Sequence, residues 1–146
     1  MDSLTFNIII SNKDSQNIYS DNTPYSFSVE LPYVIRLPGE WTCSIESVYS
    51  TALLVSSHPP CVHILLDFVR PSIAYCRELR IGGTFQYDCD KETETASFST
   101  PTQHSVIVDN TFLERMHIDI LDPELEHCTF LSNKTIVILK FIQKNG

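Results

Sequence analysis

Three side chains that can bind a metal stand close together at His58, Cys61 and His63. Alternate residues of a strand point to one face, so Cys61 and His63 would share a face if this segment is extended. A structural zinc site needs four ligands at a recognisable spacing, and no fourth ligand accompanies these three. The segment therefore predicts a strand that begins after the proline pair at residues 59–60, with no metal and no cofactor.

Four carboxylates alternate along a second candidate site, at Asp88, Asp90, Glu92 and Glu94. Carboxylates in a loop can bind calcium, but this run lacks the glycine and the ligand order of an EF-hand loop. Burial of four carboxylates without partners is costly. We therefore expect an exposed and mobile acidic tip of a hairpin.

Motifs for covalent catalysis are missing from the sequence, which contains no G-x-S-x-G, no S-x-x-K and no cysteine in a catalytic context. His104, His117 and His127 lie in polar surroundings, and the sequence alone identifies no convincing catalytic partner for them at a predictable distance. The pair Gly82-Gly83 is too short to bind phosphate and predicts a turn. We expect no catalytic residues and a protein that is not an enzyme.

The segments that carry these residues have the two-residue period of half-buried strands. Residues 25–49 contain two such runs, the second of which begins at Trp41 and places that indole in the core. Pro32, Pro38 and Gly39 predict that the first run ends and the chain turns between them. Further runs lie at residues 4–10, 62–68, 85–87 with 96–98, 106–108 and 116–120, whereas residues 73–81 fit either a short strand or one helical turn. The predicted core residues are Phe27, Val29, Trp41, Ile45, Ile64, Leu66, Ile118 and Ile120.

The last run, residues 135–142, is apolar at nearly every position. A strand of this kind is covered on both faces, so we expect it to lie centrally in a sheet or under a partner. Ile136, Ile138 and Phe141 are the residues expected at an interface between subunits.

About eight short strands separated by turn signals, with little helix, predict an all-β fold. We expect one domain over residues 1–146, a single jelly-roll β-sandwich of antiparallel strands.

Charge and composition exclude several classes of function. The net charge is −8 and the ten Lys and Arg residues are scattered, which argues against a direct nucleic-acid partner. The chain has no apolar run long enough to span a membrane and no secretory signal at its N-terminus. The five cysteines form no C-x-x-C pair and are expected to be free, as in the cytosol or nucleus.

Three stretches resemble one family of proteins. The segment LPYVIRLPGEWTCSI at residues 31–45 resembles a corner of virus-like proteins encoded by Polinton (Maverick) elements and adintoviruses. The segment HILLDFVRPSIAYCRELRI at residues 63–81 is similar to a second part of those proteins, through Asp67, Pro71, Leu79 and Arg80. Residues 116–141 are similar to their closing strand-turn-strand.

In that family and in the related virophages, short single jelly-roll proteins are minor capsid proteins. They form pentamers at the icosahedral vertices beside a double jelly-roll major capsid protein. The resemblance implies a structural virion protein, a penton, that is assembled in the host cytoplasm or nucleus. Its partners would be further copies of itself and the major capsid protein. The alternative is a non-enzymatic β-sandwich binding module of the trimeric receptor-ligand or carbohydrate-binding type.

Overall fold

The computed structural model describes residues 4–53, 58–100 and 104–144. These residues form strands and turns without a helix, and so contain no helix that could cross a membrane. The strands are β1 Thr5–Ser11, β2 Ser26–Arg36, β3 Trp41–Ala52, β4 Cys61–Leu66, β5 Ser72–Ala74, β6 Arg77–Leu79, β7 Ile81–Asp90, β8 Thr95–Ser99, β9 Val106–Ile107, β10 Phe112–Leu121 and β11 Leu131–Gln143.

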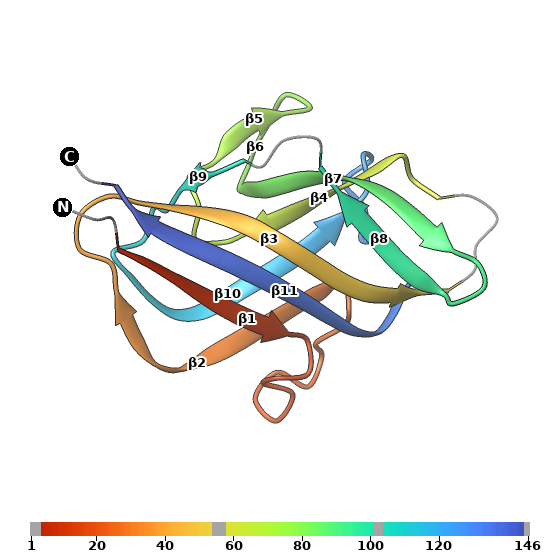
Figure 1. The fold of residues 1–146 in the computed structure, drawn as a ribbon, viewed down its shortest axis with the longest axis horizontal. Coiled ribbons are helices and arrows are strands. Elements are labelled where there is room, and N and C mark those ends of the chain that lie inside the picture. The colour runs from red at the N-terminus through yellow and green to blue at the C-terminus, as the bar shows by residue number, and fades with distance from the viewer. Residues whose placement is uncertain (1–3, 54–57, 101–103, 145–146) are drawn as a thin grey trace.

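Two antiparallel layers account for most of these strands (Figure 1). One layer has the order β1-β11-β3-β9, and the other has the order β2-β10-β4-β7. Consecutive strands alternate between the layers from β1 to β4, as in the two Greek keys of a jelly roll. Strand β8 pairs with both β7 and β3, so it links the two layers at one edge. The expected jelly roll is therefore confirmed.

The core lies between the inner faces of the two layers. Alternation along each strand sends one set of apolar side chains inward, which removes them from water. Every core residue that the sequence predicted lies there, with an exposed fraction of at most 5%. These residues are Phe27, Val29, Trp41, Ile45, Ile64, Leu66, Ile118 and Ile120.

Strand β2 does not end at Pro32, as the sequence predicted, but continues to Arg36. It is the edge strand of its layer, where a missing N–H leaves no gap in a ladder. The register passes from Glu30 opposite Arg115 to Ile35 opposite Leu113, so β2 has a bulge at residues 31–34. The turn itself lies at residues 37–40 and contains Gly39, whose φ is +82°.

The pair Gly82-Gly83 lies inside β7 and is not the turn that we expected. A Cβ atom on Gly82 would clash with the side chain of Leu66 and lie 3.3 Å from Ile45 Cδ1. Glycine is therefore required by the close approach of the β7 backbone to the core.

Residues 73–81 form a strand pair and not a helical turn. The hairpin β5-β6 turns at Tyr75 and Cys76, whose φ values are +53° and +60°. Two successive positive φ angles are typical of a type I′ turn, which suits the twist of a tight hairpin. In Figure 1 this hairpin stands apart from the two layers.

The acidic tip connects β7 to β8, which form the predicted hairpin, but the ladder continues through Asp88, Cys89 and Asp90, so the loop is shorter than expected and Tyr87 lies opposite Phe98. Its carboxylates at residues 88, 90, 92 and 94 are all exposed. Asp90 Oδ1 accepts a hydrogen bond from the N–H of Glu92 at 2.9 Å, which supports the turn.

Replacement of the four acidic residues by Asn and Gln is expected to change the free energy of unfolding by less than about 1 kcal/mol, because exposed charges contribute little. Asn at position 90 keeps the acceptor oxygen of the turn. Urea unfolding with and without calcium measures the effect. A loss of several kcal/mol, or stabilisation of the unchanged protein by calcium, would show that the tip binds a cation or a basic neighbour.

The last strand, β11, lies between β1 and β3, which confirms the expected central position. Val137, Leu139 and Phe141 point inward and are fully buried, whereas Ile136 and Ile138 point outward. Phe141 is therefore wrongly placed among the expected interface residues. Its ring stacks on Phe6 at a centroid distance of 4.9 Å and is covered within the subunit.

Candidate functional site

Of the three side chains considered as metal ligands, His63 makes hydrogen bonds within the protein, and the His58 ring packs against Tyr87 and Phe130. His63 is 7% exposed, and its Nδ1 and Nε2 atoms lie 2.8 Å from Thr84 Oγ1 and 2.7 Å from Tyr75 Oη. Burial lowers the pKa of His63, against the opposing charge of Asp122. Within the described part of the chain, no three His, Cys, Asp or Glu side chains are arranged to hold a metal ion.

Treatment with a chelator is expected to leave the melting temperature unchanged, because both ring nitrogens of His63 already have protein partners. Differential scanning fluorimetry with and without EDTA measures this, and elemental analysis of the purified protein is the control. Stoichiometric zinc together with unfolding in chelator would contradict the prediction.

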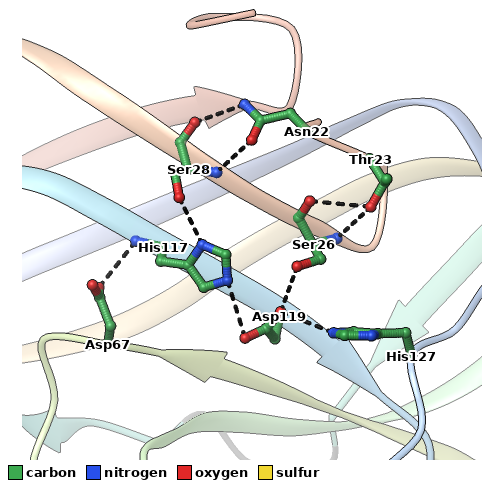
Figure 2. Close-up of polar contacts among 8 residues, drawn as sticks. All are labelled: Asn22, Thr23, Ser26, Ser28, Asp67, His117, Asp119 and His127. Atoms are coloured by element: carbon green, nitrogen blue, oxygen red, sulfur yellow. Dashed lines mark hydrogen bonds and ion pairs between the residues drawn. The ribbon is translucent and has the colours of Figure 1, made fainter. Parts of the chain in front are cut away.

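A polar cluster gathers around Asp119 on the outer face of the layer that contains β2 and β10 (Figure 2). We call it the Asp119 cluster. Its members come from the loop before β2, from β2 itself, from the end of β4, from β10 and from the loop after β10. They are Asn22, Thr23, Ser26, Ser28, Asp67, His117, Asp119 and His127.

Asp119 is the centre of this cluster. Its Oδ1 atom accepts hydrogen bonds from Ser26 Oγ at 2.7 Å and from His127 Nε2 at 3.0 Å. Its Oδ2 atom lies 3.2 Å from His117 Nε2. Burial acts to raise the pKa of Asp119, but the hydrogen bonds from His117, Ser26 and His127 outweigh it and lower the pKa to about 2. Asp119 is therefore a carboxylate at any pH near neutrality.

His117 connects β10 to β2. Its Nδ1 atom lies 2.7 Å from Ser28 Oγ, while its main-chain N–H donates to Asp67 Oδ1 at 3.0 Å. The hydrogen bond to Asp119 raises the pKa of His117, although burial opposes this. Burial raises the pKa of Asp67, although the hydrogen bond from the His117 main chain acts the other way.

Two further side chains join the loop before β2 to the cluster. The amide of Asn22 binds both main-chain groups of Ser28, as acceptor at 2.9 Å and as donor at 2.8 Å. Thr23 Oγ1 likewise accepts from the N–H of Ser26 and donates to its carbonyl, both at 3.0 Å. Asn22 and Thr23 therefore fix the main chain of Ser28 and Ser26, and this positions the two serine hydroxyls.

Ser28, His117 and Asp119 have the spacing of a nucleophile, a base and the acid that orients the base. The N–H of Ser28, which could otherwise stabilise an oxyanion, is already donated to Asn22. The polar groove beside the cluster, of about 430 Å³, is lined by Asp67 of the cluster but not by Ser28, His117 or Asp119. The geometry therefore supports a role in charge-assisted hydrogen bonding between elements better than it supports a catalytic role.

That His117 and His127 share Asp119 as a partner was not predicted from the sequence. A signal was present for His117, because Asp119 follows it by two residues and alternate residues of a strand share a face. The contact between Ser28 and His117 could not be predicted from the sequence, since only the β2-β10 register places the two residues opposite each other. His127 returns to Asp119 because the loop after β10 folds back, with His127 bridged to Leu121.

A second surface feature lies on the outer face of the other layer. Ile9 of β1 pairs with Ile138 of β11, and Ile136 pairs with Tyr49 of β3. Ile9 and Tyr49 are 65% and 57% exposed. We call these four residues the outer apolar patch. The pairs place apolar side chains side by side on a face that the described chain leaves partly open to solvent.

The described residues form an all-β jelly-roll sandwich. Neither a family model nor a curated protein matches the sequence.

Proposed function

We propose that this protein is a penton, a minor capsid protein that forms the vertices of an icosahedral virion as a homopentamer. The observation that carries the proposal is the strand order, β1-β11-β3-β9 facing β2-β10-β4-β7. Eight strands in two Greek keys are the architecture of viral capsid domains, although lectins and cupins share it. The resemblance of residues 31–45, 63–81 and 116–141 to proteins of Polinton elements and adintoviruses favours the capsid among these.

The subunit would act by surface complementarity and not by turnover. A vertex ring needs a heterologous contact, in which one side of a subunit meets a different side of the next and the rotation closes. The outer apolar patch supports such a contact because apolar side chains at the centre of an interface contribute most of its affinity. A stable contact of this kind covers about 800 Å² on each partner. The ring would bind a major capsid protein around it in the virion.

The solution mass of the purified protein tests the proposal. Light scattering coupled to size exclusion is expected to give about five times the 16.6 kDa of one chain. A trimer would favour a binding module of the receptor-ligand or carbohydrate-binding type. A monomer that persists at high concentration and shows no affinity for a capsid protein would overturn the proposal.

A further inference from the structure

The Asp119 cluster joins three segments that are far apart in the sequence. Ser26 and Ser28 belong to β2, His117 and Asp119 to β10, and His127 to the loop after β10 (Figure 2). We propose that this cluster is a pH-dependent clamp, which holds β2 on β10 more firmly in mild acid than above neutral pH.

Strand β2 has reason to depend on side-chain contacts. Among the described residues it is an edge strand whose one strand partner is β10, and its ladder is interrupted by the bulge at residues 31–34. Strands with an incomplete ladder open at low free energy. The strength of the clamp therefore sets how often β2 opens.

The protonation of His117 changes the strength of the clamp without changing its geometry. A protonated ring donates from Nδ1 to Ser28 Oγ and from Nε2 to Asp119 Oδ2, so the second bond is also an ion pair. In the neutral ring, Nε2–H still donates to Asp119 while Nδ1 accepts from the Ser28 hydroxyl. The contacts persist, but the charge that strengthens them is lost.

The direction of each pKa shift gives the pH range of the clamp. A histidine with a raised pKa contributes fully below its ordinary value of about 6.5, and its contribution is lost as pH rises through the folded pKa. Asp119 contributes above its ordinary value of about 3.9 and loses its contribution as pH falls toward 2. The clamp is at full strength between about pH 4 and about pH 6.5.

Other charged groups face His117 from the neighbouring elements. Asp67, at the end of β4, favours the protonated ring, whereas Arg115 of β10 opposes it. Glu30 of β2 is bound by the Tyr19 hydroxyl at 2.8 Å and acts on Arg115. His127 shares the carboxylate of Asp119 from the loop side. Because Asp67 and Arg115 act in opposite directions, Asp119 is the group whose removal affects His117 most.

Titration of His117 by NMR tests the electrostatic part of the proposal. In the unchanged protein its midpoint is expected above the ordinary histidine value of about 6.5, and in Asp119→Asn it is expected to fall toward that value. Asp88→Asn, at the exposed acidic tip, removes the same charge outside the Asp119 cluster and is the matched control. A midpoint at or below the ordinary value in the unchanged protein would overturn the proposal without any variant.

Hydrogen exchange tests whether the charge on His117 affects the opening of β2. After correction for intrinsic rates, amides of β2 are expected to exchange roughly fivefold to tenfold faster at pH 8 than at pH 5.5, the factor expected when charge-assisted hydrogen bonds become neutral ones. Asp119→Asn should remove most of this difference, and Asp88→Asn should retain it. Equal pH dependence in the two variants would overturn the clamp. The clamp acts within one subunit, so the result is independent of whether the protein forms a capsid.

Discussion

Replacement of Trp41 by alanine is expected to lower the free energy of unfolding by about 3–5 kcal/mol. Trp41 begins β3, is 5% exposed, and packs edge to face on Phe6 at a ring-centroid distance of 5.4 Å. Its indole Nε1–H donates to the carbonyl of Pro38 at 2.9 Å, which ties the ring to the turn before the strand. Alanine would leave a cavity and remove one of the two hydrogen bonds that the Pro38 carbonyl accepts, the other coming from Gln143 Nε2 at 2.9 Å.

Urea unfolding, followed by circular dichroism, measures this prediction. Trp41→Phe keeps most of the ring but removes the N–H donor, so its cost is expected to be about 1–2 kcal/mol. Tyr33→Ala is the control, because that aromatic side chain is 70% exposed and its loss should change stability by less than about 0.5 kcal/mol. A loss below about 1 kcal/mol in Trp41→Ala would contradict the burial of the indole.

The strands and the core could be predicted because the alternation of apolar and polar residues in a half-buried strand shows which face is buried. Phe27 and Val29 alternate with serines, and Ile118 with His117 and Asp119, so only one choice of faces buries the apolar set. Where that alternation held, the predicted core residues are the buried ones.

The errors arose where the local pattern was ambiguous. Pro32 is compatible with a strand only at an edge, and the edge position of β2 is decided by strands distant in sequence. Gly82 suggests a turn until the side chain of Leu66 is placed against it. Residues 135–142 are apolar at nearly every position, so only Lys140 distinguishes the two faces near Phe141. Lys140 marks the outer face, and by the two-residue period Phe141 points inward, which the sequence prediction overlooked.

The contacts of the Asp119 cluster were likewise predictable only in part. His117 and Asp119 could have been paired from their spacing on one strand, whereas Ser28 and His127 arrive from other elements. Polar side chains on the outer face have no apolar alternation of their own, so their partners follow only from the register between strands. A site assembled in this way becomes visible only once the fold is known.

The substitution Ile138→Lys is expected to convert the proposed pentamer into soluble, folded monomers. Ile138 points outward from β11, next to Ile9 of β1, so a lysine there can extend into solvent in an isolated subunit. In an interface the same charge would be buried without a partner, which costs several kcal/mol and raises the dissociation constant more than a hundredfold.

Light scattering gives the mass of the variant, and circular dichroism shows whether it remains folded. Ile136→Lys, on the same outer face, is expected to behave in the same way. The matched control is Ile73→Lys, which places the same charge on the β5-β6 hairpin at a residue that is 74% exposed, and it should leave the pentamer intact. Val137→Lys should instead unfold the subunit, because Val137 is 0% exposed and faces the core. A pentamer that persists in both Ile136→Lys and Ile138→Lys would mean that the subunits meet on another surface of the sandwich.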